Sequence, residues 1–252
     1  MAHSPIGINK KYPVKLTCIL VLLIALFTTS FIVERKSTPL TVLTYLIKEP
    51  KVKTFKPPLL ILMHGIGSNE KDMFGLANQL SAKFLVVSIR GPYEIGSNGY
   101  GWFHADFRTD TPTYNKEEAE KSRRKIIQFI TELKQIHSFD QSKVYLCGFS
   151  QGGVMAYNVG LSHPDVIKGI AVMSGRLLDT APRNASKSEN AKMLHVFISH
   201  GTTDPVISIK NARAALVVLK SLNIKPTYKE YAEGHAINHD MMQDLTKWLN
   251  QQ

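Results

Sequence analysis

The chain has 252 residues, of which 44% are hydrophobic and 20% are charged, and its formal net charge is +11. This composition predicts one large globular domain with a sizeable core. The basic residues are scattered and no nucleic-acid-binding module occurs, so we interpret them as a solvated surface and expect no nucleic-acid partner.

An uncharged apolar stretch, LTCILVLLIALFTTSFIV at residues 16–33, lies between a basic leader and the charged residues 34–36. Its length is at the lower edge of a membrane-spanning helix and above the usual signal-peptide core. We expect residues 1–36 to form a basic leader plus an N-terminal transmembrane anchor, which we favour, or a cleaved signal segment. Residues 37–252 would form the folded domain. A short basic leader tends to stay inside, which predicts a membrane-anchored protein with an extracytoplasmic domain, or a secreted one if the leader is cleaved.

The cysteines and histidines do not predict a disulfide or a metal site. Cys18 lies in the apolar stretch and Cys147 ends a strand candidate, so we expect no bond between them. His235 and His239 have i, i+4 spacing, but no Glu follows the first one as a zinc-protease helix requires. We therefore expect no bound metal.

After residue 40, short apolar segments alternate with helical patterns. The strand candidates are bounded by Gly and polar residues and lie at residues 41–48, 59–63, 84–89, 143–147, 166–173, 194–199 and 226–231. Continuous apolar runs of this kind are typical of strands buried on both faces of a parallel sheet. Helical patterns occur at residues 126–136, 154–161, 212–219 and 237–249. The alternation predicts an α/β fold with a mostly parallel, doubly wound sheet and helices on both faces.

The segment GFSQGG at residues 148–153 contains the pattern G-x-S-x-G between a strand candidate and a helical stretch. At such a strand-to-helix turn the serine backbone is strained and its hydroxyl is exposed at the carboxyl edge of the sheet. The helix N-terminus that follows favours negative charge. The flanking glycines are expected because side chains would collide with the neighbouring strand and helix. Ser150 is therefore a candidate nucleophile rather than part of a simple turn.

A serine hydroxyl needs a general base, with an acid behind the base. In this kind of fold the chain order is Ser, acid, His. Asp204 follows the strand candidate at 194–199, and His235 follows the one at 226–231, so both lie on loops that leave strand ends. We expect Ser150, Asp204 and His235 to form a catalytic triad, with Asp240 and Asp244 as lower-ranked candidates for the acid.

The site also needs an oxyanion hole built from backbone N–H groups. We expect one from Gln151, directly after the serine, and one from Ile66 in the HGIG turn that follows residues 59–63. The long irregular stretch 91–115 is the expected pocket wall, and its Trp102 and Phe103 are candidate substrate-binding residues. Packing against the sheet is the other role open to these aromatic residues. The short segment 174–193 leaves no room for a cap domain.

Six motifs in this order resemble the phospholipase/carboxylesterase group of α/β-hydrolases, which also contains acyl-protein thioesterases. They are HGIG (64–67), RGP (90–92), GFSQGG (148–153), MSGRLL (173–178), HGTTDPVI (200–207) and EGHAI (233–237). The resemblance spans nearly all of residues 55–250. It implies an α/β-hydrolase fold, cleavage of carboxylic or thioester bonds without metal or organic cofactor, and the roles given above for the triad and the oxyanion donors. Ser68-Asn69-Glu70 stands where the thioesterase members usually have an Asp.

We therefore expect a serine esterase that hydrolyses carboxylic or thioester bonds of a small-molecule or lipid substrate through an acyl-enzyme. A lysophospholipase or an acyl-protein thioesterase is the alternative among enzymes. A hydrolase-like protein that only binds a ligand is the alternative from another class. It is disfavoured because degenerate members normally lose the Ser, the His or the acid, and all of these are present.

Overall fold

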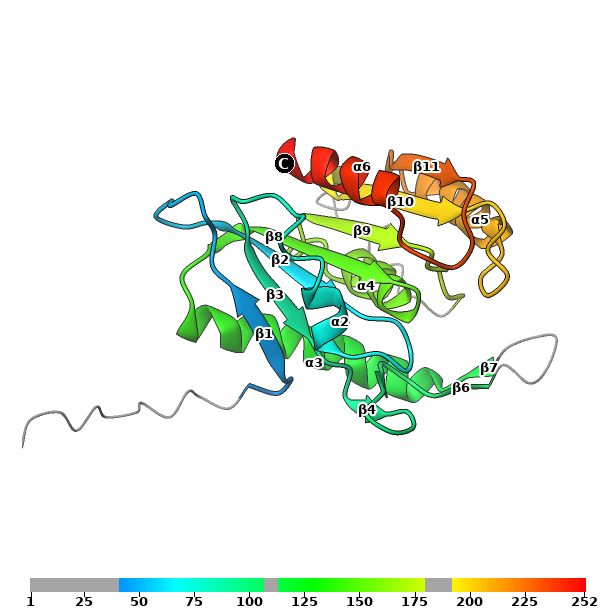
Figure 1. Ribbon diagram of the computed structural model, residues 1–252, viewed down its shortest axis with the longest axis horizontal. Helices are drawn as coiled ribbons and strands as arrows, with labels where there is room; N and C mark the ends of the chain where they lie inside the picture. The colour runs from blue at the N-terminus through cyan, green and yellow to red at the C-terminus, as the bar shows by residue number, and fades with distance from the viewer. Residues whose placement is uncertain (1–40, 107–112, 180–191) are drawn as a thin grey trace, which may run out of the picture. The chain divides into compact units, whose positions relative to one another are not determined.

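A seven-stranded sheet runs through the residues that the computed structural model describes, 41–106, 113–179 and 192–252 (Figure 1). The strand order is β1-β3-β2-β8-β9-β10-β11. β1 (Tyr45–Lys48) is antiparallel to β3 (Leu85–Ile89), and every other neighbouring pair is parallel. The remaining strands are β2 (Pro58–Met63), β8 (Asp140–Phe149), β9 (Gly169–Met173), β10 (His195–Gly201) and β11 (Thr227–Tyr231).

Helices cover both faces of this sheet, as predicted (Figure 1). One face packs against α3 (Lys116–Ile136), α4 (Gln151–Ser162) and α5 (Ile209–Ser221). The opposite face packs against α2 (Glu70–Phe74) and α6 (His239–Asn250). No cap domain is evident in the described residues.

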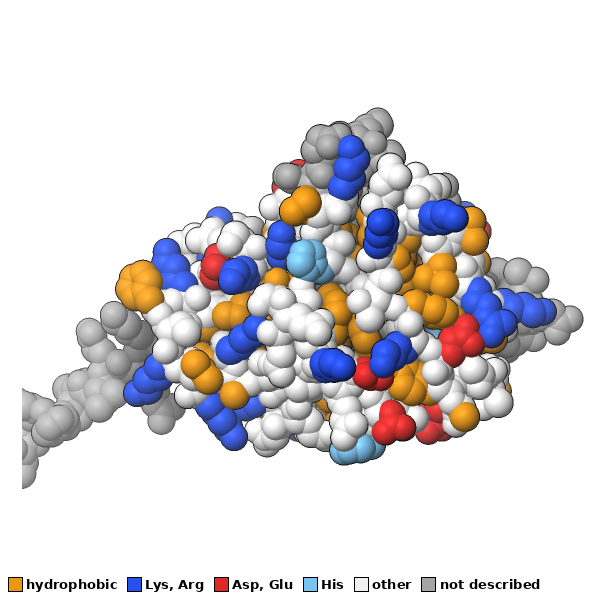
Figure 2. All heavy atoms as spheres, turned by 90° about the horizontal axis from the view of Figure 1, so that it is seen from above, with side chains coloured by type: hydrophobic (Ala, Val, Ile, Leu, Met, Phe, Trp, Pro, Cys, Tyr) orange, Lys and Arg blue, Asp and Glu red, His pale blue; other side chains and the backbone are white. Residues whose placement is uncertain are grey.

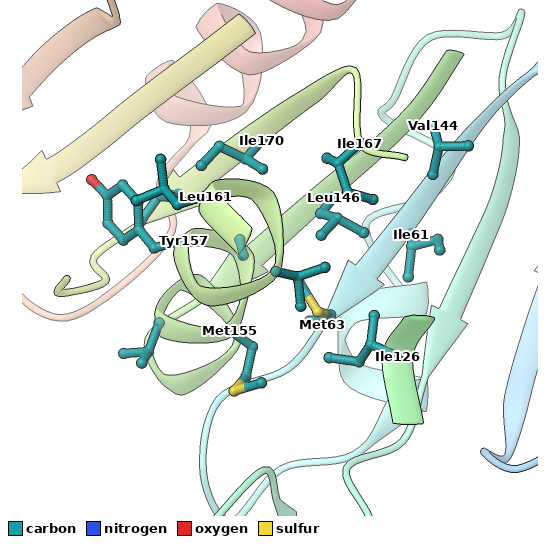
Figure 3. Packing of buried hydrophobic residues seen from close by; sticks show 14 of the residues in the cluster. Ile61, Met63, Ile126, Val144, Leu146, Met155, Tyr157, Leu161, Ile167 and Ile170 are labelled. Atoms are coloured by element: carbon teal, nitrogen blue, oxygen red, sulfur yellow. The ribbon is translucent and has the colours of Figure 1, made fainter. Parts of the chain in front are cut away.

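Alternate residues of each central strand belong to different cores. Leu59, Ile61 and Met63 of β2 belong to the core beneath α3, α4 and α5, whereas Leu60 and Leu62 belong to the core beneath α2 and α6. Figure 3 shows the first core, where the strand side chains meet those of α4. Because both faces are covered, most positions in such a strand are apolar, and this is why the strands appear in the sequence as nearly continuous apolar runs.

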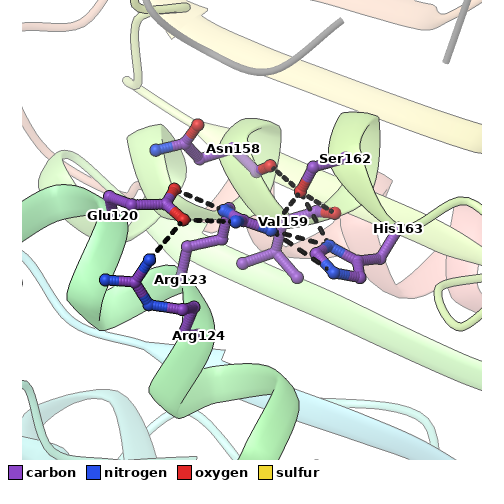
Figure 4. Close-up of polar contacts among 7 residues, drawn as sticks. All are labelled: Glu120, Arg123, Arg124, Asn158, Val159, Ser162 and His163. Atoms are coloured by element: carbon purple, nitrogen blue, oxygen red, sulfur yellow. Dashed lines mark hydrogen bonds and ion pairs between the residues drawn. The ribbon is translucent and has the colours of Figure 1, made fainter. Parts of the chain in front are cut away.

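A polar network joins α3 to α4 outside the core (Figure 4). The Arg123 guanidinium of α3 donates to Glu120 one turn earlier, with an Nε–Oε2 distance of 2.7 Å. It also lies 3.4 Å from the Ser162 hydroxyl and 3.2 Å from the His163 ring at the end of α4. The hydrogen bond from Arg123 lowers the pKa of Glu120, so the pair is charged at neutral pH. The network fixes the end of α4 that lies away from Ser150.

The stretch 91–115 is more regular than we expected from its sequence. It contains two short antiparallel pairs, β4 (Tyr93–Glu94) with β5 (Tyr100–Gly101) and β6 (Ala105–Asp106) with β7 (Thr113–Tyr114). Residues 107–112, between the second pair, lie outside the described part of the chain. Helix α2 was also not predicted, because its five residues are too few to show a helical period.

The prediction of an N-terminal membrane anchor, and of an extracytoplasmic or secreted protein, is corrected here. Across residues 41–106, 113–179 and 192–252, no helix has the length and apolarity needed to cross a bilayer. The apolar stretch 16–33 and the expected boundary between residues 36 and 37 lie outside the described residues. We therefore assign neither an anchor nor a location to the protein.

The basic side chains do not gather into one patch on the face shown in Figure 2. There, Lys and Arg side chains stand singly or in small groups between apolar and neutral ones, with a few acidic side chains among them. Several of the basic residues are paired, such as Arg213 with Glu230 and Lys229 with Asp244, both at 2.8 Å. This distribution is that of a solvated surface.

Candidate active site

Ser150 occupies the turn between β8 and α4, at the carboxyl edge of the sheet. Its backbone has φ 53° and ψ −115°, a conformation that is costly for a residue with a side chain. The Ser150 amide donates to the Met173 carbonyl of β9 at 2.9 Å, which ties the turn to the neighbouring strand. The strained turn that the G-x-S-x-G pattern predicts is therefore present in the structure.

The glycines on either side of Ser150 are needed because backbone approaches them closely. A Cβ at Gly152 would lie 2.0 Å from the Met63 carbonyl oxygen of β2, and one at Gly148 would lie 2.1 Å from the Gly152 oxygen. Neither obstacle is a flexible side chain that could move aside. The start of α4 is thus pressed against the ends of β2 and β8, and this close packing holds Ser150 in its strained conformation.

The three residues that we expected to form a triad lie in one chain of hydrogen bonds. The Ser150 Oγ lies 2.9 Å from His235 Nε2, and His235 Nδ1 lies 2.7 Å from Asp204 Oδ2. They come from the ends of β8, β10 and β11, which meet at one edge because these strands are parallel. The Phe149 ring packs on the imidazole of His235, with ring centroids 4.9 Å apart.

Asp204 is buried and its carboxylate is fully engaged. Its Oδ1 accepts hydrogen bonds from the amides of Val206 and Ile207, both at 2.8 Å. Burial alone would raise the pKa of Asp204, but the hydrogen bonds from His235 and from these amides outweigh it, and the pKa is lowered. The carboxylate is therefore charged at neutral pH. The amides that stabilise the charge belong to the same HGTTDPVI segment, in which the backbone after Asp204 turns back toward its carboxylate.

His200 is a neighbour of Asp204 that the sequence did not lead us to single out. It is fully buried, and its Nε2 lies 2.6 Å from the Ile207 carbonyl oxygen and 3.3 Å from Asp204 Oδ2. It thus closes the loop around the carboxylate. The lower-ranked acid candidate Asp244 points elsewhere, because its two oxygens bind Lys229 and the Tyr231 hydroxyl.

The amides of Ile66 and Gln151 are available to a ligand. Neither N–H donates to another group in the described residues. The amide of Gln151 opens α4 and so has no partner within the helix. Ile66, Gln151 and Ser150 all line the same cavity, and a Cβ on Gly65 would lie only 3.3 Å from the Ser150 Cβ. The loop that carries Ile66 is thus packed directly against the serine.

A buried histidine supports that loop. His64 Nε2 accepts from the Gly91 amide at 2.9 Å, so Nδ1 carries the proton and donates to the Gly65 carbonyl at 2.7 Å. Burial lowers the pKa of His64, which keeps this neutral form. The indole N–H of Trp102 donates to the His64 carbonyl at 2.9 Å. These bonds fix the backbone that leads directly into the Ile66 amide.

The two aromatic residues expected to bind substrate have different positions. Trp102 is 0% exposed and does not reach the cavity, so it is corrected to a supporting residue. Its amide donates to Gln151 Oε1, and Gln151 Nε2 donates to the Phe103 carbonyl, both at 2.7 Å. Phe103 lines the cavity beside Ser150. Phe107, also in that stretch, lies outside the described residues.

An ion pair missed from the sequence anchors α2 beside this loop. Arg90, in the RGP segment, donates from Nε and Nη2 to the two carboxylate oxygens of Glu70, each at 2.6 Å. The Glu70 side chain is buried, and the hydrogen bond from Arg90 lowers its pKa. Such bidentate pairs are rigid as well as strong. Only the tertiary structure shows this pairing, since nothing in the sequence links the two positions.

Two cavities meet at Ser150. The first, of about 550 Å³, is lined by Ile66, Phe103, Ala105, Ser150, Gln151, Val154, Arg176, Pro205, Val206, Ile207, Ser208 and Asn211. The second, of about 430 Å³, is lined by Gly65, Ile66, Ser68, Asp72, Met73, Leu76, Phe149, Ser150, Val206, His235, Ala236 and Ile237. Ile66, Ser150 and Val206 are common to both. A molecule bound over the serine could therefore extend in two directions. No group of three or more His, Cys, Asp or Glu in the described residues could hold a metal ion.

Residues 46–252 match the family model described as phospholipase/carboxylesterase. The chain belongs to the phospholipase/carboxylesterase family. Within this family it is 28% identical over 254 residues to "Probable carboxylesterase SOBER1-like" of Arabidopsis thaliana, with 96% of this chain and 94% of the relative covered. It is 23% identical over 206 residues to "Acyl-protein thioesterase 1" of Mycosarcoma maydis, with coverages of 72% and 83%.

The fold is that of solved esterases. The crystal structure of the Bacillus cereus carboxylesterase superposes with a TM-score of 0.71 at 20% identity, over 83% of this chain and 94% of that one. This likeness confirms the predicted α/β-hydrolase fold with its mostly parallel sheet. Membership of the phospholipase/carboxylesterase family supports an ester hydrolase of the carboxylesterase or thioesterase type.

The glycine two residues after Ser150 can be tested by substitution. Gly152→Ala should destabilise the protein by about 3 kcal/mol or more, because the added methyl group meets the Met63 carbonyl and the backbone must shift. Urea unfolding of the purified variant measures this. Gly234→Ala is the matched control, since a Cβ there meets nothing within 4 Å and should change stability little. Equal unfolding midpoints for the two variants would contradict the packing described here.

Proposed function

We propose that this protein is a serine hydrolase that cleaves carboxylic or thioester bonds, with Ser150 as nucleophile. The observation that carries the proposal is the hydrogen-bonded chain from Ser150 through His235 to Asp204, which begins at a strained strand-to-helix turn. A serine in this setting has a base in contact with its hydroxyl and an acid in contact with the base. Membership of the phospholipase/carboxylesterase family supports the same chemistry.

In the first step, Ser150 Oγ attacks the carbonyl carbon while its proton passes to His235 Nε2. The Asp204 carboxylate accepts the Nδ1–H of His235, holds the ring in the tautomer that leaves Nε2 free, and stabilises the imidazolium. The two amides that hold Asp204 Oδ1 keep the other oxygen directed at the ring. The acid thus acts by position and charge and does not itself take the proton.

The negative charge that develops on the carbonyl oxygen needs donors that are already in place. The amides of Ile66 and Gln151, which have no partner among the described residues, are the proposed donors, and the N-terminus of α4 adds a favourable dipole. His64 and Trp102 keep the Ile66 loop fixed, and the Gln151 side chain is tied to backbone on both sides of Trp102. Donors held this way do not have to reorganise during the reaction.

The tetrahedral intermediate then collapses. His235 Nε2 gives its proton to the leaving alcohol or thiol, and the acyl group stays on Ser150. A water molecule attacks this acyl-enzyme with His235 as base, which releases the acid and restores the serine hydroxyl. Each step uses side chains and amides of this chain together with water. The two cavities on either side of Ser150 are suited to hold the acyl part and the leaving group.

The substrate class within this reaction is a small-molecule or lipid ester. Protein acyl thioesters are a second candidate, supported by the relative described as an acyl-protein thioesterase. A chain-length series of nitrophenyl esters, measured beside a lysophospholipid and an acyl thioester, separates these substrates. The class with the highest kcat/KM is the one the site has been shaped for, because kcat/KM measures binding of the transition state. No turnover of any of them would favour a protein that only binds.

Ser150→Ala tests the nucleophile. Ester turnover should fall by about 10³-fold or more, since the oxyanion donors and cavities remain but the attacking oxygen is gone. Steady-state kinetics with a nitrophenyl ester, on protein shown to be folded, measures this. Ser221→Ala, which removes an exposed hydroxyl at the end of α5, should retain wild-type turnover. Activity of Ser150→Ala within tenfold of wild type would mean that another group attacks.

Asp204→Asn tests the acid. The amide side chain cannot stabilise the imidazolium, and turnover should fall by about 10²-fold or more. The matched control is Asp244→Asn, which removes a carboxylate bound to Lys229 and Tyr231. Initial rates of ester turnover are measured and compared for the two variants, with folding checked by circular dichroism. If the two variants retain similar activity, Asp204 has no special role.

A further inference from the structure

Arg176 extends from the loop after β9 into the first cavity beside Ser150. This cavity is also lined by Gln151 and Val154, in the first turn of α4. The loop can approach α4 because residue 175 is a glycine, where a Cβ would lie 3.0 Å from the Gly153 Cα. Arg176 is partly buried, and its guanidinium lies over the Tyr114 ring, 5.8 Å from the ring centroid. It is therefore held at the cavity by packing.

The guanidinium of Arg176 has no carboxylate partner in the described part of the chain. Every other arginine described there is paired with a glutamate: Arg90 with Glu70, Arg123 and Arg124 with Glu120, and Arg213 with Glu230. An arginine that is partly buried without a counter-ion is costly, because it loses hydration and gains no charge partner. Its five N–H donors suit a carboxylate or a phosphate.

The rest of the first cavity favours a negative charge as well. Among its described lining residues none is Asp or Glu. Ser208 and Asn211 belong to its wall, and Ser208 is the N-cap of α5, so the positive end of that helix faces the cavity. The second cavity, by contrast, includes Asp72 in its lining. The two cavities beside the serine thus differ in charge.

We propose that the first cavity selects esters or thioesters that carry an anionic group, a carboxylate or a phosphate, and that Arg176 binds this group. The inference rests on the proposed function and names the substrate class for it. The apolar side chains of Phe103, Val154 and Ile207 contact the part of the substrate between the ester and the anion. The substrate is therefore amphiphilic, with its charge at a distance from the bond that is cleaved.

Kinetics with paired substrates test this. One pair has the anion on the acyl side: the mono-nitrophenyl ester of glutaric acid and nitrophenyl pentanoate, which have equal chain lengths. The other has it on the leaving group: para-carboxyphenyl acetate and its neutral methyl ester. The ratio of kcat/KM, anionic over neutral, is measured for wild type, Arg176→Gln, Arg176→Lys and Lys220→Gln. Lys220 is exposed on α5 and away from both cavities, so it controls for lost net charge.

Arg176→Gln should lower this ratio by about tenfold or more in at least one pair, because a charged hydrogen-bonded contact is lost. The pair that responds shows whether the acyl group or the leaving group occupies the first cavity. Arg176→Lys should give a ratio between those of wild type and Arg176→Gln, since it keeps the charge but loses the paired N–H donors of the guanidinium. Lys220→Gln should leave the ratio of kcat/KM, anionic over neutral, unchanged. The preference of wild type should also weaken as salt is added.

Binding without turnover separates this inference from the proposed function. Glutarate should bind the Ser150→Ala variant in a calorimetric titration, and the double variant Ser150→Ala/Arg176→Gln should lose that binding. If wild type hydrolyses the neutral esters but Arg176→Gln and Lys220→Gln give the same ratios, and glutarate binds both Ser150→Ala proteins equally, only the anionic-substrate inference is overturned. If wild type hydrolyses none of the esters, the proposed function fails first.

Discussion

The contact between the first turn of α4 and the end of β2 is the constraint on which the site depends. Backbone at Gly152 lies so close to the Met63 carbonyl that no side chain fits between them, and the chain must turn sharply at residue 150. Ser150 takes a positive φ as a result, and its hydroxyl is presented at the edge of the sheet. The strain is maintained by two well-packed cores beneath the turn.

The other groups reach this edge because the strands that carry them are parallel and end together. β8 ends directly before Ser150, while the loops after β10 and β11 bring Asp204 and His235. Further hydrogen bonds fix two of the groups. Two backbone amides hold the Asp204 carboxylate, and His64 holds the loop of Ile66. The same edge carries Arg176, which gives one of the two cavities a positive charge. The parallel strand ends thus position the triad residues, and the same edge carries the arginine proposed to select the substrate.

The sheet and the residues that meet at its edge were predictable, because buried parallel strands appear in the sequence as apolar runs. Their apolar runs indicated the sheet, and the spacing of motifs after them indicated which residues would meet. Trp102 was misplaced because its stretch has no hydrophobic period in the sequence that shows which side chains point inward. The five-residue α2 depends on its pairing through Glu70 with Arg90, a contact no local pattern reveals. Arg176 could not be singled out from the sequence either, because the absence of a counter-ion is visible only once the neighbouring side chains are placed.

The most direct test of the account is the site of covalent modification by an active-site-directed reagent. A fluorophosphonate reacts with a serine only when that hydroxyl is activated by a base. Wild-type protein would be labelled, digested and analysed by tandem mass spectrometry. We expect one adduct, on the side chain of Ser150. An adduct on a different residue, or no adduct on folded protein, would contradict the role of Ser150 as nucleophile.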